Sequence, residues 1–144
     1  MKTIAVPHST LSVPAIVLGL MRIAKMSNAD IRALFDAAQE VGVTMIDHAD
    51  VYGGAPHVCE ARFAEAVPLT AGARDKVVIQ TKAGIRKGYF DFSKDHILAA
   101  VDGSLKALNT PYIDVLLLHR HMPAVDVVAG LRPSSGSVGT SRCR

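Results

Sequence analysis

Three short apolar runs, each followed at once by a polar side chain, constrain the fold of this chain most strongly. The run 43–46 is followed by Asp47, the run 77–81 by Lys82, and the run 115–118 by His119. Between them, apolar residues recur with helical spacing, as in the set Ile31, Leu34, Phe35, Ala38 and Val41. Strands that alternate with helices predict a parallel sheet with right-handed crossovers. In such a sheet the polar residues that end the runs meet at one carboxyl edge.

Capping signals mark where the helices between these runs begin and end. Ser27 and Ser93 each precede a helical pattern and are predicted to be N-cap residues. Gly42 is predicted to end the first helix in a left-handed conformation. We expect Pro56 to lie in the first turn of a helix that runs through Ala66.

The remaining segments complete the expected order of elements. Residues 3–18 read as a short hairpin, and the first sheet strand is expected near residues 16–20. The β-branched run 77–81 is typical of a strand buried on both faces. Residues 84–92 are expected to form a polar loop, and residues 112–118 the fourth strand.

Chain length decides how much of a closed fold these elements can make. The sequence has 144 residues, whereas a complete (β/α) TIM barrel needs roughly 250. We therefore predict an α/β fold: an incomplete parallel barrel of about four βα units with an amino-terminal β-hairpin. Residues 1–130 are expected to form this half-barrel domain. Residues 131–144, rich in Ser, Gly and Pro, are expected to be disordered, with a composition typical of a frame-shifted reading or a cloning scar.

Composition excludes several classes of function. The chain is 49% hydrophobic and 20% charged, which favours a globular protein over a disordered one. The net charge of +3 is mild and the basic residues are scattered, so no nucleic-acid partner is expected. No apolar run approaches ~18 residues, so no membrane span is predicted. Two cysteines without metal-type spacing fit a reduced, cytoplasmic compartment. A basic segment at 74–87 is read as a solvated loop, with an anion-steering patch as the alternative.

The polar residues at the strand ends suggest proton-transfer chemistry. Asp47, Lys82 and His119 end the runs, and Tyr52 follows Asp47 by five positions. A carboxylate, an ammonium, an imidazole and a phenol at one rim suit proton transfer to a carbonyl oxygen. The face at which the strands of such barrels end is also where their catalytic groups collect.

Three motifs in this order resemble the signature of the aldo/keto reductases. They are Asp47–Gly53, the strand end Ile79–Lys82, and Leu116–Arg120, within a similarity that spans about residues 12–122. The subgroup resembled comprises bacterial oxidoreductases with Asp-His-Ala-Asp-x-Tyr-Gly-Gly. The resemblance implies NADPH-dependent reduction of aldehydes or ketones, with a small-molecule carbonyl substrate.

The same resemblance implies a role for each residue at the rim. Tyr52 would be the general acid, and Lys82 would stabilise its phenolate. Asp47 would hold Lys82 charged and would also contact the cofactor. His119 would orient the substrate carbonyl for hydride attack.

Two alternatives remain open from the residues themselves. In the first, a metal-dependent barrel hydrolase, the ligands would come from His48, His119, His121, Asp47 and Asp50. Strand alternation places His48 on the side opposite Asp47, which makes a packing role, or a role in supporting the site from behind, at least as plausible as metal binding. The second is a truncated, non-catalytic product that binds NADPH weakly and self-associates through its open sheet edges.

Overall fold

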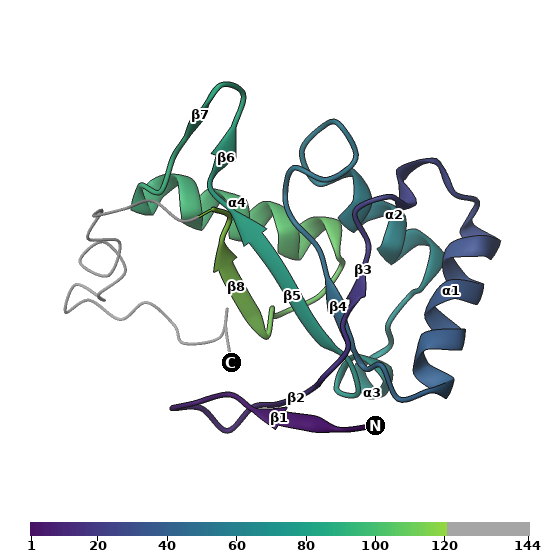
Figure 1. The fold of residues 1–144 in the computed structure, drawn as a ribbon. Helices are drawn as coiled ribbons and strands as arrows, with labels where there is room; N and C mark the ends of the chain where they lie inside the picture. The colour runs from purple at the N-terminus through teal and green to yellow at the C-terminus, as the bar shows by residue number, and fades with distance from the viewer. Residues whose placement is uncertain (121–144) are drawn as a thin grey trace.

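A parallel four-stranded sheet with helices packed against it forms the centre of the molecule (Figure 1). The computed structural model describes residues 1–120. The strands β3 (Leu18–Gly19), β4 (Met45–Asp47), β5 (Val78–Ala83) and β8 (Val115–Leu118) lie in that order across the sheet. They are connected in turn by α1 (Asn28–Glu40), α2 (Val58–Ala66) and α4 (Lys94–Ala107). This is the incomplete barrel-type α/β arrangement predicted from the sequence.

The register of the sheet aligns the strand ends. All three pairings are parallel; Asp47 lies opposite Gln80, and Lys82 lies opposite Leu117. Because parallel strands run in one direction, β4, β5 and β8 all finish at the same edge of the sheet. The residues at and just beyond these ends are therefore brought within reach of one another.

Side chains of β5 alternate between two environments. One set is buried: Ile79, Thr81 and Ala83; the other is half-buried: Val78, Gln80 and Lys82. The prediction that this strand is buried on both faces is wrong for the described part of the chain. The polar side chains of Gln80 and Lys82 reach Asp47 on the second face, where an apolar lining was expected.

The core between helices and sheet consists of two apolar clusters. In the first, the rings of Phe35 in α1 and Phe63 in α2 pack edge to face, with their centroids 5.5 Å apart. They lie beside Ile46 and Ile79 of the sheet. The second lies under α4 and contains Ala83, Ile97, Ala100, Val101 and Ile113. Burial of these side chains fixes α1, α2 and α4 on the sheet.

Three of the predicted caps are confirmed. The hydroxyl of Ser27 accepts a hydrogen bond from the backbone N–H of Asp30, and that of Ser93 accepts one from the N–H of His96. Gly42, just after α1, has φ +82°, a conformation that glycine adopts without a steric cost. The local sequence therefore determines where α1 and α4 begin.

The start of α2 differs from the prediction. The helix begins at Val58, two residues after Pro56, and residues 50–57 before it form turns. The N–H of His57 donates to the carbonyl of Asp50 at 2.6 Å, and His57 itself has φ +62°. This left-handed residue stops the helix from extending back to Pro56.

The expected polar loop at 84–92 is also a correction. It contains a small antiparallel hairpin of β6 (Ile85–Arg86) and β7 (Tyr89–Phe90), which projects from the sheet in Figure 1. The turn is Lys87-Gly88, and Gly88 has φ +86°, a conformation that glycine adopts without a steric cost. Each strand has only two residues, too few for a recognisable alternating pattern.

The amino terminus forms the predicted hairpin, with β1 (Thr3–Ala5) antiparallel to β2 (Ser12–Pro14). The first sheet strand, β3, is shorter than expected and starts at Leu18. Two short helical segments complete the described chain: η1 (Ile23–Lys25) and α3 (Ala71–Arg74).

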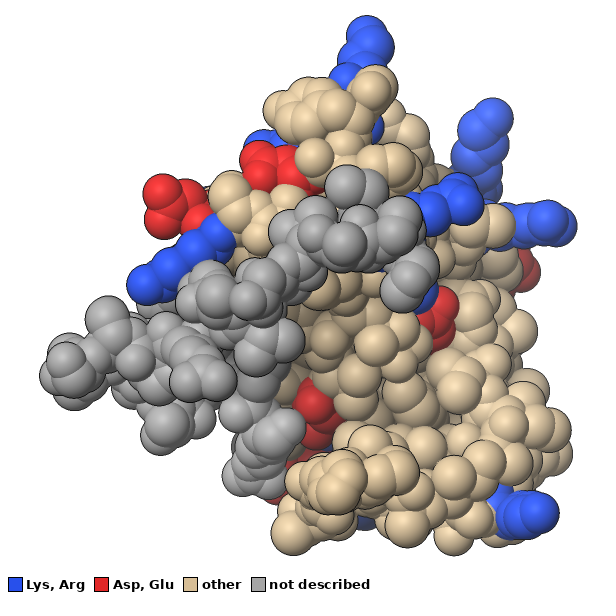
Figure 2. All heavy atoms as spheres, turned by 60° about the vertical axis from the view of Figure 1, so that its left-hand side comes forward, with Lys and Arg blue, Asp and Glu red and all other residues tan. Residues whose placement is uncertain are grey.

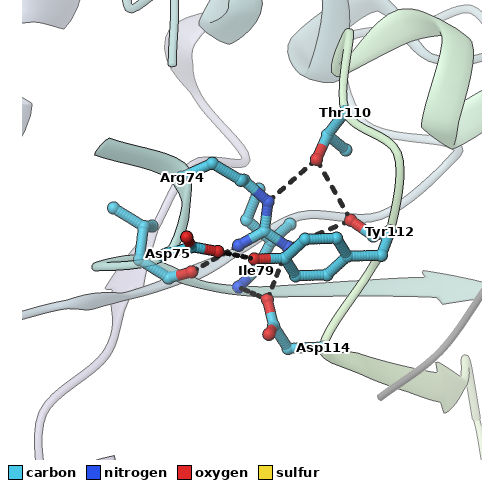
Figure 3. A network of polar contacts seen from close by, with 7 residues as sticks. Arg74, Asp75, Ile79, Thr110, Tyr112 and Asp114 are labelled. Carbon is cyan, nitrogen blue, oxygen red and sulfur yellow. Dashed lines mark hydrogen bonds and ion pairs between the residues drawn. The ribbon is translucent and has the colours of Figure 1, made fainter. Parts of the chain in front are cut away.

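A buried arginine lies at the amino-terminal end of β5 (Figure 3). Arg74 donates to Asp114 at 2.6 Å, to the hydroxyl of Thr110 at 2.8 Å, and to the carbonyls of Val77 and Tyr112 at 2.6 and 3.0 Å. The reading of residues 74–87 as a solvated loop is therefore wrong for Arg74, which is 3% exposed. This network ties α3 to the segment that leads into β8. The fourth strand begins at Val115, not at Tyr112 as expected.

The predictions for residues 131–144 and for His121 lie outside the described residues. Within residues 1–120, none of the helices has the length and apolar character needed to cross a membrane.

Candidate active site at the carboxyl edge of the sheet

Lys82 is the centre of a polar cluster at this edge. Its Nζ lies 2.7 and 2.6 Å from the two carboxylate oxygens of Asp47, 2.9 Å from the carbonyl oxygen of His48, and 3.0 Å from the hydroxyl oxygen of Tyr52. The side chains of Lys82 and Asp47 are only 14% and 21% exposed, so salt screens the pair less than a surface pair. Three of the residues singled out from the sequence are therefore in direct contact.

Gln80 also belongs to this cluster, although its place there was not predicted from the sequence. Its side-chain N–H donates to Oδ1 of Asp47 at 2.5 Å, and the two residues lie directly opposite each other in the sheet. Gln80 precedes Lys82 by two positions, so strand alternation puts both on the same face. That period of two is the signal that could have identified it.

His119 follows β8 and lies against Tyr52. The two rings meet nearly at right angles, 85°, with centroids 5.8 Å apart. Burial lowers the pKa of His119, and the positive charge of Lys82 lowers it further. A neutral imidazole is thereby favoured next to the phenol. All four predicted residues come together at the edge.

His48 and Asp50 lie differently from the other four. His48 is fully buried and packs edge-on against Phe63 of α2, with ring centroids 5.3 Å apart. Burial lowers the pKa of His48 to about 4. Asp50 is 5% exposed, and burial, followed by the negative charge of Glu60, raises the pKa of its carboxyl. His48 therefore has the packing position that strand alternation favours.

The metal-site alternative finds no geometric support in the described chain. Across residues 1–120, no three His, Cys, Asp or Glu side chains are placed to share a metal ion. His48 points to the helix layer while Asp47 is bonded to Lys82 on the other face. Strand alternation thus separates two of the proposed ligands.

A second polar cluster, also missed from the sequence, holds the loop that carries Tyr52. Glu60 of α2 is fully buried; its carboxylate accepts from the hydroxyl of Thr81 at 2.6 Å and lies 2.6 Å from Nδ1 of His57. Burial opposes ionisation of Glu60, but hydrogen bonds from His57, Thr81 and Ser104 hold the pKa of its carboxyl below the usual value. The hydrogen bond to Glu60 in turn raises the pKa of His57.

This His57–Glu60 pair is a structural clamp. Ser104 Oγ, at 3.4 Å, shares the same ring nitrogen of His57 as Glu60 does, whereas a nucleophilic triad uses the two ring nitrogens for its two partners. The clamp joins the Tyr52 loop to α2, α4 and β5. The carbonyl of Tyr52 also accepts from the N–H of Cys59 at 3.1 Å, which fixes the loop at its centre.

The arrangement can deliver a proton at the rim. Lys82 donates to the oxygen of Tyr52, so the phenolic proton is directed away from the ammonium. A positive charge at this position stabilises the phenolate that remains after proton loss. The neutral imidazole of His119, beside the phenol, can hydrogen-bond an oxygen that approaches both rings.

Known proteins share both the sequence and the fold. The sequence profile of the aldo/keto reductase family matches residues 15–133. The chain is 40% identical over 110 residues to the uncharacterized oxidoreductase YcsN of Bacillus subtilis, an alignment that covers 69% of this chain and 36% of that protein. It is 35% identical over 129 residues to the 6-dehydroglucose reductase of Agrobacterium fabrum, covering 81% of this chain and 43% of that protein.

Solved structures give the same result. A crystal structure of an aldo-keto reductase from Pseudomonas aeruginosa superposes with a TM-score of 0.72 at 27% identity, covering 88% of this chain and 50% of that one. The holo form of an aldo-keto reductase from Bacillus halodurans gives 0.68 at 30% identity, covering 81% and 40%. The chain thus spans between a third and a half of the length of these relatives, and it shares their fold over that part. It belongs to the aldo/keto reductase family.

Proposed function

We propose that the site at the carboxyl edge reduces aldehydes or ketones to alcohols with NADPH. One observation carries the proposal: Lys82 Nζ bonds both oxygens of Asp47 and the hydroxyl oxygen of Tyr52 at once. This chain of contacts links a carboxylate, an ammonium and a phenol in the order that proton donation from the phenol requires. Membership of the family and the oxidoreductase names of the relatives support the redox half of the reaction.

In this proposal each residue has a defined task. Tyr52 donates its proton to the carbonyl oxygen, and Lys82 stabilises the phenolate. Asp47 keeps Lys82 in place, and the neutral imidazole of His119 donates a hydrogen bond that orients the carbonyl. When bound, NADPH supplies the hydride.

Asp47 is the residue we assign to cofactor contact. Its carboxylate has about four lone-pair sites, and the described contacts are two from Lys82 and one from Gln80. The carboxylate can therefore accept another hydrogen bond without losing Lys82. This remaining capacity fits a hydroxyl-bearing cofactor group at the rim.

The extent of the chain determines how the proposal is tested. Because the chain spans 36% of the Bacillus subtilis relative, we propose that on its own it binds NADPH weakly and has little activity. Activity is therefore measured on a fusion in which the remaining carboxyl-terminal portion comes from that relative. NADPH consumption is followed by absorbance with a panel of aldehydes and ketones.

The decisive variant is Tyr52→Phe in this fusion. It removes the phenolic proton and keeps the ring, so kcat should fall by about 10²-fold or more, the scale of a lost general acid. The matched control is Tyr89→Phe, which makes the same change on the exposed hairpin and should leave kcat unaltered. An unchanged kcat for Tyr52→Phe would contradict the assignment.

A further inference from the structure

The turn segment 50–57, which presents Tyr52 to the rim, is closed at its end by His57. The backbone N–H of His57 donates to the carbonyl of Asp50 at 2.6 Å, so the two ends of the segment are joined. Within it, the carbonyl of Tyr52 accepts from the N–H of Cys59 at 3.1 Å. The position of Tyr52 therefore depends on how firmly this segment is closed.

The side chain of His57 is held between α2 and α4. Its Nδ1 lies 2.6 Å from Oε2 of Glu60 and 3.4 Å from Oγ of Ser104. Its Nε2 packs against Gly103, at a place where even a Cβ would be too close. Glu60 is fully buried and also accepts from the hydroxyl of Thr81 in β5 at 2.6 Å. A single imidazole thus connects the turn segment to two helices and, through Glu60, to the sheet.

His57 is the basic member of a trio that also contains two buried acids. Asp50 and Glu60 are 5% and 0% exposed, whereas the side chain of His57 is 23% exposed and can exchange its proton with water. Carboxylates removed from water are costly unless a cation or several hydrogen-bond donors compensate them. The hydrogen bond to Glu60 raises the pKa of His57 against the effect of burial, and the negative charges of Glu60 and Asp50 raise it further.

The other ionisable groups near the trio come from each neighbouring element. His96 of α4 and Arg86 of the hairpin favour the charged form of Asp50, and His48, just after β4, favours that of Glu60. His48 has a pKa of about 4 and is neutral well above it. Figure 2 shows basic side chains projecting at the upper end of the molecule, the end where the hairpin lies in Figure 1, and salt screens charges so exposed. These groups act at a distance, without the direct contact that the imidazolium makes.

We infer that His57 is a positioning residue, whose protonation locks the turn segment 50–57 and so holds Tyr52 at the rim. The imidazolium makes a charge-assisted hydrogen bond to Glu60 and balances the charge of Asp50. When the proton leaves, Nδ1 keeps at most a neutral hydrogen bond, and two buried carboxylates lose this cation, so the segment opens more often. The stabilisation is complete below pH 6.5 and is lost as the pH rises through the raised pKa of His57.

The consequence for catalysis rests on the proposed function, whereas the state of the turn segment does not. If Tyr52 is the general acid, kcat of the fusion should fall as the pH rises through the titration of His57, because Tyr52 is then at the rim for a smaller fraction of the time. In His57→Asn this step should be absent, with kcat already at the lower level at pH 6. An unchanged kcat for Tyr52→Phe would remove this consequence and leave the measurement on the segment unaffected.

The test measures amide hydrogen exchange of the ¹⁵N-labelled 144-residue protein, from pH 6 to a pH above the titration of the His57 ring, which is followed in the same samples. Rates are expressed as protection factors, which removes the intrinsic dependence of exchange on pH. The probes are the N–H groups of Tyr52, His57 and Cys59, and the reference is that of Val43, which is bonded to the carbonyl of Ala38. The ratio of probe to reference protection should fall by about tenfold over this range, the scale by which a charge-assisted hydrogen bond exceeds a neutral one. Its midpoint should coincide with the ring titration.

The variant His57→Asn separates the charge of the imidazolium from its hydrogen bond. Asparagine tolerates the left-handed conformation at this position, φ +62°, and its side-chain amide can donate to Glu60 without a charge. The protection ratio should then be low at every pH. The matched control is His8→Asn, the same change at an exposed histidine with φ +60°, which should behave as the wild type does.

Three outcomes would overturn the inference. One is a protection ratio that stays constant with pH in the wild type. Another is a ratio at pH 6 that is as high in His57→Asn as in the wild type. The last is a loss of protection at Val43 equal to that in the turn segment, since His57 would then stabilise the whole domain and not the position of Tyr52.

Discussion

The buried imidazole of His48 should make the fold sensitive to mild acid. His48 is fully buried, neither ring nitrogen has a hydrogen-bond partner in the described chain, and burial lowers its pKa from 6.5 to about 4. In the unfolded chain the ring takes up a proton near pH 6.5, whereas in the folded chain it stays neutral until about pH 4. Burial of neutral His48 therefore has no pH-dependent cost to the folded state above pH 6.5, and the free energy of unfolding decreases as the pH falls from 6.5 towards 4.

The size of the effect follows from the two pKa values. A difference of about 2.5 units, at about 1.4 kcal/mol per unit, amounts to roughly 3 kcal/mol when the pH is well below 4. Between pH 7 and pH 5 the expected loss is about 2 kcal/mol. That is a large share of the ~5–15 kcal/mol by which domains are normally stable.

Other groups titrate in the same interval, so the effect must be isolated by substitution. The hydrogen bond to Glu60 raises the pKa of His57, and this contribution is present below pH 6.5 and is lost as the pH rises, the opposite trend. His48→Phe removes only the His48 titration and keeps an aromatic ring beside Phe63. His8→Asn is the control, since it removes an exposed imidazole at a positive-φ position that Asn tolerates.

The assay is urea unfolding followed by circular dichroism at pH 7, 6 and 5, at one fixed protein concentration. We expect the free energy of unfolding of the wild type and of His8→Asn to fall by about 2 kcal/mol more than that of His48→Phe from pH 7 to pH 5. A nuclear magnetic resonance titration of His48 should give a midpoint about 4. Equal losses in all three proteins, or a midpoint near 6.5, would refute the reasoning.

Three further predictions concern packing and assembly. Arg74→Met should cost about 3 kcal/mol in urea unfolding, because Asp114, whose side chain is 13% exposed, loses its cation and keeps only the N–H of Ile79. Arg32→Met, which breaks an exposed ion pair, should cost less than about 0.5 kcal/mol; similar losses would contradict this. Gly103→Ala should destabilise by about 1–3 kcal/mol, since the new Cβ would lie 2.3 Å from Nε2 of His57. Gly72→Ala, with nothing within 4 Å, is its neutral control. Sedimentation should show self-association, which we expect to involve the outer strand β3. A titration with NADPH should show weak binding. A stable monomer that binds NADPH at micromolar levels would rule this out.

The order of strands and helices was predictable because it depends on local patterns. Apolar runs, the serine caps of α1 and α4, and Gly42 each act within a few residues. The meeting of Asp47, Lys82 and His119 at one edge follows from the same patterns, because a parallel sheet gathers its strand ends. The spacing from Asp47 placed Tyr52 at the same rim, but its role required the family resemblance, since Tyr52 lies in the turns beyond β4 rather than at a strand end.

The polar clusters behind the rim could not be predicted in the same way. Thr81 and Glu60 are 21 positions apart, Ser104 and His57 are 47 apart, and Arg74 and Asp114 are 40 apart. Each pair forms only when separate elements pack together, so neither residue carries a local signal. A charged residue in a single sequence reads as solvated, which is why the burial of Arg74 and Glu60 was missed.

The arginine network in Figure 3 determines where the chemistry at the opposite end of the sheet can occur. Asp114 accepts from Arg74 and from the N–H of Ile79, and its own N–H donates to the carbonyl of Ile79. These bonds fix the starts of β5 and β8 relative to each other. Each strand then rises about 3.3 Å per residue, so the number of residues from Ile79 to Lys82 and from Asp114 to His119 decides how far along the sheet each side chain lies. Inserting or deleting one residue between Asp114 and His119 would move the imidazole by that distance and turn it to the other face of the sheet. We therefore expect length changes in relatives of this chain to be confined to the loops, and excluded from the segments between Ile79 and Lys82 and between Asp114 and His119.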